Sequence, residues 1–188
     1  MRRYFVAVLG LAAIACGDVV VVELANAAKP AVELSVEGRS NAHVTLASTG
    51  NRLAAAWIAS NEAGADVYAA VSEDGENHFG PPVRVNDLPG DAGGNGEQPP
   101  RVVLKDRAMI VVWVSKRDGV SGIRAAQSND GGRTFSKTRT ISPEGVTGAR
   151  GWESAAIDEA GVVHAAWLDG RHAAPKAAAT NNTQNSGV

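Results

Sequence analysis

The residues best suited to chemistry in this sequence are arginines and carboxylates in the segments between apolar runs. A guanidinium binds a carboxylate through two parallel hydrogen bonds, and carboxyl groups can supply acid and base at a glycosidic bond. This mixture predicts a site for an anionic sugar, and the alternative is that these are solvated loop charges. The substrate-binding candidates are Arg101, Lys116, Arg117, Arg150, Asp169 and Arg171, and the same segments hold Glu62, Asp87, Asp118, Glu153 and His172. Asp169 and Arg171 could equally form a local ion-paired turn, and no residue is assigned as catalytic.

Metal and nucleic-acid chemistry find little support in the sequence. The four histidines show no spacing typical of zinc, and the single cysteine, Cys16, lies near the N-terminus. His164 falls within an apolar segment and is predicted to be a buried core residue. An acidic linker has oxygen atoms that a cation could use, but its residues Asp87, Asp91, Asn95 and Glu97 match the spacing of no calcium loop. The net charge is −2 and the basic residues are scattered, so we expect no nucleic-acid partner, and no metal or cofactor is assigned.

Three tryptophans reveal an internal repeat. Trp57, Trp113 and Trp167 each follow an apolar run, at spacings of 56 and 54 residues, and a serine and a phenylalanine recur at the spacing of 56. Each period holds four short strand-like segments separated by turn residues, which is typical of one blade of a β-propeller. The expected strands span 43–47, 53–59, 67–71 and 83–85 in the first repeat, 101–104, 109–114, 123–127 and 138–141 in the second, and 154–157 and 162–168 in the third.

The predicted fold is all-β: a partial β-propeller with two complete four-stranded blades and about half of a third, over residues 32–172. The first two strands of each blade are continuous apolar runs and are expected to be buried. Residues 173–188 lack an apolar period and are predicted to be a disordered tail. Closed propellers have about four to eight blades, and an unclosed set exposes strand edges and apolar faces. We therefore favour a fragment of a longer propeller, with a ring of several copies and an open array as alternatives.

Residues 1–27 are predicted to be a signal peptide. The chain begins M-R-R, an apolar run covers 4–17, and A-N-A at 25–27 offers a cleavage site. The run is shorter than the roughly 20 residues of a membrane-spanning helix. A second option is a lipoprotein signal that ends before Cys16, and a third is a retained anchor. We expect a secreted or periplasmic protein, with lipid anchoring at Cys16 as the alternative, that meets a membrane only through a signal or lipid.

A turn motif in the second repeat is the most specific signal. Residues 128–135 read S-N-D-G-G-R-T-F, in which Ser and Asp side chains can bond backbone amides and glycine permits positive φ. Residues 72–79 read S-E-D-G-E-N-H-F, a degenerate copy with Glu76 and His78 in place of glycine and threonine. The motif at 128–135 resembles the Asp-box of the sialidase (neuraminidase-like) superfamily, whose BNR repeats build β-propellers. The expected structural Asp-box residues are Ser72, Asp74, Phe79, Ser128, Asp130, Gly132, Thr134 and Phe135, and calcium binding is the alternative for these turns.

The resemblance covers about residues 32–171 and implies an exported protein similar to exo-α-sialidases, which cleave terminal sialic acid from glycoconjugates. Enzymes of the family bind the substrate carboxylate with three arginines and use an aspartate acid/base and a tyrosine nucleophile paired with a glutamate. Neither Tyr4 nor Tyr68 matches that nucleophile, and the Arg-x-Pro pattern of the first arginine does not occur. Arg101, Arg150 and Arg171 are the best candidates for anion contacts, although none matches a catalytic motif.

The sequence therefore predicts a truncated sialidase-like protein that is not catalytic in this form; an active form would be a glycoside hydrolase of the exo-α-sialidase type. One alternative is a non-enzymatic module that binds a glycan or a protein, and another is a vestigial fragment. The expected partner is a sialylated or other anionic glycan. Unclosed blades would also permit self-association.

Overall fold

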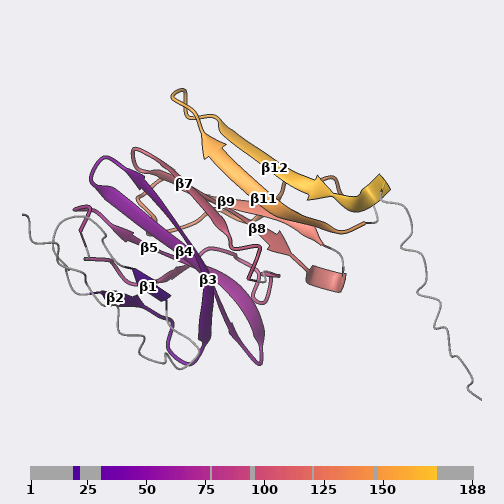
Figure 1. The fold of residues 1–188 in the computed structure, drawn as a ribbon, viewed down its shortest axis with the longest axis horizontal. Coiled ribbons are helices and arrows are strands. Elements are labelled where there is room, and N and C mark those ends of the chain that lie inside the picture. Colours follow the sequence, from indigo (N-terminus) through magenta and orange to yellow (C-terminus); the bar gives the residue numbers. More distant parts are fainter. Residues whose placement is uncertain are drawn as a thin grey trace, which may run out of the picture.

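The computed structural model consists of antiparallel β-strands and two 3-10 turns, η1 (Arg117–Gly119) and η2 (Gly170–His172) (Figure 1). It describes residues 19–21, 31–76, 78–93, 96–119, 121–145 and 148–172. The all-β prediction is confirmed. Across these ranges, no helix has the length and apolar character needed to cross a membrane.

The first four-stranded sheet is a meander in the order β3-β4-β5-β6. Strand β4 is buried on both faces and is rich in alanine, which lets neighbouring layers approach closely on either side. Ala54 and Ala56 point to one face, and Ala55 and Trp57 point to the other. The strands are β3 (Ser40–Thr49), β4 (Arg52–Asn61), β5 (Gly64–Ser72) and β6 (Val83–Arg84).

The second sheet repeats this meander, and a hairpin follows it. Its strands are β7 (Arg101–Lys105), β8 (Ala108–Ser115), β9 (Gly122–Ser128) and β10 (Arg139–Thr140). The hairpin comprises β11 (Arg150–Ile157) and β12 (Val163–Asp169), which form a two-stranded sheet. Figure 1 shows this yellow-orange hairpin beside β7–β9, and its Trp167 packs on a cluster from β8 and β9. The chain thus stacks three sheets in sequence order.

A short N-terminal ladder covers the outer face of the first sheet. Strand β1 (Val19–Val21) pairs antiparallel with β2 (Val32–Leu34), and Leu34 is buried in the cluster that contains Trp57. β1 falls within the predicted signal peptide, so cleavage after residue 27 would remove β1 and leave β2. The rest of that peptide, including Cys16, and the predicted tail 173–188 lie outside the described residues.

The three tryptophans occupy equivalent places. Trp57 and Trp113 lie in the second strand of their sheets, opposite Tyr68 and Arg124 of the third strand. Trp57 faces β2, Trp113 lies in the core shared by the two four-stranded sheets, and Trp167 faces the second sheet. Each indole therefore packs on the layer that precedes it in sequence, so the repeat in the sequence is also a repeat in space.

Two burial predictions are wrong. The first two strands are buried in the second sheet, but β3 and the hairpin are not, since Leu46 and Leu168 are 48% and 63% exposed. In the described part of the chain, no further sheet covers these faces. His164 is not a core residue either: it points to the open face of β12 and its imidazole pairs with the Asp158 carboxylate at 3.1 Å. Side chains alternate between the two faces of a strand, and residues 163, 165 and 167 point inward, so His164 points outward.

Candidate functional site

The candidate residues gather at one end of the sheets, which we call the loop rim (residues 61–64, 116–119, 121, 149–150 and 169–172). An antiparallel meander sends the connection between its second and third strands to one end and its other turns to the opposite end. The linker before β7 bonds to the rim ends of two sheets, through Ala92 N to Ala65 O at 2.9 Å and Gly93 N to Val114 O at 2.8 Å. Within the hairpin, Gly170 N donates to Ala149 O at 2.8 Å. The linker therefore joins the first and second sheets at this end.

Three predicted residues meet at the end of the hairpin. The Asp169 carboxylate oxygen Oδ2 accepts hydrogen bonds from Arg150 Nε at 3.2 Å and from Arg171 Nη2 at 2.7 Å. Arg150 is 4% exposed and also donates from Nη1 to Ser121 O at 3.2 Å, which fixes its orientation. The side chain of Arg171 is 32% exposed. The Arg171 hydrogen bond is the main reason that the pKa of Asp169 lies well below its ordinary value.

The local turn considered for Asp169 and Arg171 is present as well. The backbone N–H of Arg171 donates to Asp169 Oδ1 at 3.1 Å. The two arginines therefore converge on one carboxylate. Arg150 is buried behind Asp169, and Arg171 is the guanidinium that solvent reaches.

Arg101 belongs to a different environment. Its Nε donates to the backbone oxygen of Glu153 at 2.8 Å, which ties β7 to β11. The Glu153 side chain is buried, and neither of its carboxylate oxygens has a hydrogen-bond partner among the described residues. Burial raises the pKa of Glu153 above its ordinary value. Arg101 and Glu153 therefore lie inside the stack, beneath the rim.

Lys116 and Arg117 are exposed in the β8–β9 connection. Arg117 begins the turn η1, and its backbone N–H donates to Ser115 Oγ at 3.4 Å. Lys116 lies over the linker, where a Cβ added to Gly93 would come within 2.5 Å of Lys116 Cγ. Both cations stay on the outside of the rim, and the fold does not bring them into the Asp169 cluster.

The acidic linker uses its carboxylates on protein partners. Asp87 Oδ1 accepts from Thr138 N at 3.2 Å, and the Thr138 side chain is the main cause that lowers the pKa of Asp87. Asp91 is buried, accepts from Ser115 Oγ at 2.7 Å and lies 3.3 Å from Arg124. Burial is the largest influence on Asp91 and raises its pKa. Asn95 lies outside the described residues, and Glu62, Glu97 and His172 are exposed.

A buried network that the sequence reasoning missed anchors this linker. Asp66, at the rim end of β5, accepts from Arg39 Nη1 at 2.8 Å, Asn86 Nδ2 at 2.7 Å and Gly90 N at 2.8 Å. Asn86 Oδ1 in turn accepts from Val67 N at 2.8 Å. The signal that could have found it is the single aspartate in the otherwise apolar segment G-A-D-V-Y-A-A. Its role is to hold the rim together.

The Asp-box turns lie at the opposite end. In the second turn, Asp130 accepts from Ser128 Oγ at 2.7 Å and from Thr134 Oγ1 at 2.6 Å, and Gly132 N donates to Ser128 Oγ at 2.8 Å. The Thr134 hydrogen bond is the largest influence that holds the pKa of Asp130 well below its usual range. Phe135 is partly buried against the core between the sheets. The geometry is that of a turn closed by its own side chains.

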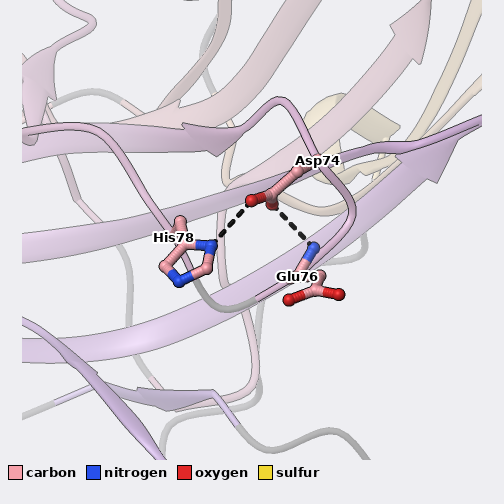
Figure 2. Close-up of side chains that lie close together, drawn as sticks. All are labelled: Asp74, Glu76 and His78. Atoms are coloured by element: carbon pink, nitrogen blue, oxygen red, sulfur yellow. Dashed lines mark hydrogen bonds and ion pairs between the residues drawn. The ribbon is translucent and has the colours of Figure 1, made fainter.

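The degenerate turn keeps this arrangement with a different donor. Ser72 Oγ donates to Asp74 Oδ1 at 2.7 Å, and His78 Nδ1 lies 2.7 Å from Asp74 Oδ2, where the second turn has the threonine hydroxyl (Figure 2). The Ser72 and His78 hydrogen bonds lower the pKa of Asp74. Phe79 bridges back to Ser72. His78 therefore replaces threonine as the residue that closes the turn.

Asp74, Glu76 and His78 also form the one group of potential metal ligands found among the described residues. Their ligand atoms lie within 4.8 Å of one another and all three residues are exposed. Both oxygens of Asp74 already accept hydrogen bonds of the turn, from Ser72 Oγ and Glu76 N on Oδ1 and from the imidazole on Oδ2. The turn therefore accounts for the contacts without an ion.

Comparisons with known proteins give a distant structural likeness. No family model matches the sequence, and no curated protein matches it. A glycosyl hydrolase structure from Bacteroides ovatus is 15% identical over 56% of this chain and 32% of that chain, with a TM-score of 0.38. A structure from Parabacteroides distasonis, described as a glycoside hydrolase, is 14% identical over 65% of this chain and 40% of that chain, with a TM-score of 0.40. The chain spans less than half of the length of either structure, and the likeness assigns no activity.

Proposed function

We propose that this chain is part of an exported, sialidase-like Asp-box β-propeller whose loop rim binds an anionic glycan without hydrolysing it. The propeller assignment is supported by two successive four-stranded meanders, by the equivalent places of the three tryptophans and by the turns at 72–79 and 128–135. A third sheet of which two strands are described continues the same stacking. These observations concern architecture, so the ligand has to be argued from the rim itself.

The pairing of two arginines with one carboxylate carries the proposal. Arg150 and Arg171 both donate to Asp169 Oδ2, and the Arg171 side chain is 32% exposed. Asp169 therefore holds an accessible guanidinium in place at the rim, where a ligand carboxylate could accept two parallel hydrogen bonds from it. Lys116 and Arg117 add positive charge to the same rim. A sugar with a carboxylate, such as a sialic acid, fits this chemistry better than a neutral sugar.

The described residues favour binding over hydrolysis. Tyr68 is the one tyrosine among them, and it stacks on Trp57 with ring centroids 6.3 Å apart. The Arg39 guanidinium also lies over the Tyr68 ring, 5.6 Å from its centroid. A ring held between these two groups packs the first sheet and is not placed as a nucleophile at the rim. The other tyrosine, Tyr4, lies outside the described residues.

Calorimetric titration with 3′-sialyllactose tests the proposal, with lactose as the neutral comparison. We expect sialyllactose to bind and the Arg171→Ala variant to bind about tenfold more weakly or worse, since one charge-assisted hydrogen bond is worth about 1.5–3 kcal/mol. Arg133→Ala is the matched control, because Arg133 is an exposed arginine at the Asp-box end. Added salt should weaken binding. Equal binding of lactose, or an equal loss in both variants, would show that the rim is not the anion site.

Hydrolysis and export are tested separately. A fluorogenic sialoside should give no turnover above background, and turnover that disappears in Arg171→Ala would replace the binding proposal with catalysis. Fractionation of expressing bacterial cells, with a mass measurement of the mature chain, tests export. Cleavage after residue 27 gives the simple secreted form, whereas lipid at Cys16 gives the anchored form. An uncleaved chain in the cytoplasm would contradict export.

A further inference from the structure

The outward face of the hairpin repeats a face that is buried inside the stack. Leu168 follows the tryptophan of β12, as Ile58 and Val114 follow those of β4 and β8. Ile58 and Val114 are both buried, and each packs on the sheet that comes next in the chain. Leu168 is exposed, and among the described residues no sheet follows it. The hairpin therefore presents an open face of the kind that seats a following sheet.

The first sheet presents the opposite side of this interface. Leu46 lies opposite the residue two positions before the tryptophan of its sheet, and Val102 and Ala155 hold the same place in the second and third sheets. Val102 and Ala155 pack on the sheet that precedes them in the chain. Leu46 is exposed, because the ladder β1–β2 supplies only two short strands on this side. The described stack thus begins with a face that lacks part of a preceding sheet.

Strand β2 has the place of a fourth strand. Val85, just after β6, shares a core cluster with the tryptophan of the second sheet. Ile141, just after β10, lines a groove of about 570 Å³ together with the tryptophan of the hairpin. Leu34, at the end of β2, lies in the cluster that contains the tryptophan of the first sheet. Each of these residues precedes the first strand of the sheet on which it packs, so β2 corresponds to β6 and β10.

Strand β1 then has the place of a third strand. In the first sheet, Tyr68 of the third strand pairs with Arg84, one residue before the core valine of the fourth. In the ladder, Val20 pairs with Glu33, one residue before Leu34. Both pairs of strands are antiparallel. The ladder therefore matches strands three and four of a sheet, whereas the hairpin matches strands one and two.

We propose that the ladder β1–β2 of one copy completes the hairpin β11–β12 of a second copy, as a four-stranded sheet in the order β11-β12-β1-β2. Strand β1 pairs with the edge of β12 that has no partner among the described residues, and both edges gain hydrogen bonds. Leu168 of the hairpin packs on the first sheet of the copy that supplies the ladder, on the side of Leu46. Both exposed leucines thereby leave water.

The pairing requires a second copy. The ladder packs on the first sheet and the hairpin on the second, so the two lie on opposite sides of the stack (Figure 1). Each copy contributes three sheets, and two copies close a ring of six. One copy or three copies would give three or nine sheets, outside the range of about four to eight blades in closed propellers. The contact is head-to-tail and closes after two copies.

The assembly needs β1 in the mature chain. A lipoprotein that begins at Cys16 keeps β1, whereas cleavage after residue 27 removes it. The proposal concerns assembly and does not depend on which ligand the loop rim binds, so calorimetry with a glycan and a mass measurement test the two separately.

Sedimentation velocity of the full chain tests the assembly. We expect a dimer, and Leu168→Asp or Leu46→Asp should each raise its dissociation constant at least about tenfold, because the carboxylate is buried in the interface without a partner. Leu88→Asp is the matched control, since Leu88 is a similarly exposed leucine in the linker, and it should leave the constant unchanged. A monomeric wild type, an open series of larger oligomers, or an equal loss in all three variants would overturn the proposal.

Mixing Leu46→Asp with Leu168→Asp tests the head-to-tail contact. A heterodimer has one interface without a substitution, whereas each homodimer has a substitution in both interfaces. We therefore expect the two variants to form a heterodimer in preference to either homodimer. A mixture that stays as monomeric as its components would indicate a contact between like faces and would overturn the proposal.

Cross-linking tests the register in the full chain with Cys16→Ala. The pairing of second and third strands in the other sheets places Val21 opposite Ala166. Val21→Cys/Ala166→Cys should therefore oxidise to a covalent dimer, because directly opposed residues lie within reach of a disulfide. Val20→Cys/Ala166→Cys is the control and should react at least about tenfold more slowly, since a shift of one residue places the thiols on opposite faces. Equal rates, or a disulfide within one chain, would overturn the proposal.

Discussion

Gly132 offers a sharp test of how the Asp-box contributes to stability. Its backbone has φ of +88°, and a Cβ at this position would lie 2.8 Å from Val71 Cγ2 of the first sheet and 3.3 Å from Met109 Sδ. A left-handed conformation costs a non-glycine residue about 1–2 kcal/mol, and overpacking of a rigid contact costs about 1–3 kcal/mol. We therefore expect Gly132→Ala to lower the free energy of unfolding by about 2–5 kcal/mol.

Gly38→Ala isolates the backbone contribution. Gly38 has φ of +72°, and an added Cβ would meet no atom within 4 Å. The Gly38→Ala variant should therefore lose about 1–2 kcal/mol of unfolding free energy from backbone conformation alone. Urea unfolding followed by tryptophan fluorescence measures both losses. Adding Val71→Ala should restore part of the stability of Gly132→Ala but not of Gly38→Ala, as a double-mutant cycle detects. Equal losses for the two glycines, with no coupling to Val71, would refute the claim that this turn packs against the first sheet.

Two other variants test the turn and the buried acid. Ser128→Ala removes the acceptor of the Gly132 N–H and should cost about 1–3 kcal/mol of unfolding free energy, whereas the exposed Ser154→Ala should cost little; similar thermal melts would contradict this role. Glu153→Gln should change how stability depends on pH. A raised pKa means that the native state binds the Glu153 proton more tightly than the unfolded state does. The contribution of this proton to the free energy of unfolding is therefore full below the ordinary pKa of 4.5 and is lost as pH rises through the native pKa. The variant should match the wild type near pH 4 and exceed it near neutrality, and a constant difference across the titration would contradict the assignment.

Local features of this protein could be predicted from the sequence because short-range physics specifies them. The turn at 128–135 contains its own donors, acceptors and glycines, so Ser128, Asp130 and Thr134 bond one another as their spacing suggests. The tryptophan period identified the second strand of each sheet. Strand limits were less accurate, since β3 begins at Ser40 and β10 contains two residues.

The candidate site was predicted only as a region. The sequence grouped Arg150, Asp169 and Arg171 as loop residues, but it did not distinguish the buried Arg150 from the accessible Arg171. It also grouped Arg101 with them, although Arg101 joins β7 to β11 beneath the rim. Arg150 and Asp169 are register partners in the β11–β12 hairpin, so strand pairing brings them together. The contact between Arg101 and Glu153 joins two sheets and depends on how the sheets stack.

Strands, turns and their repeat can be predicted from the residues alone, because alternation, glycine and side-chain caps act over a few residues. Which of two similar residues is buried depends on the packing of the sheets. Gly132 is enclosed by the first sheet while Glu76, at the same place in the other turn, is exposed. His164 and Leu168 likewise face outward in a strand whose counterparts are buried. Burial depends on which layer covers a face, and that layer is contributed by a segment far away in the chain.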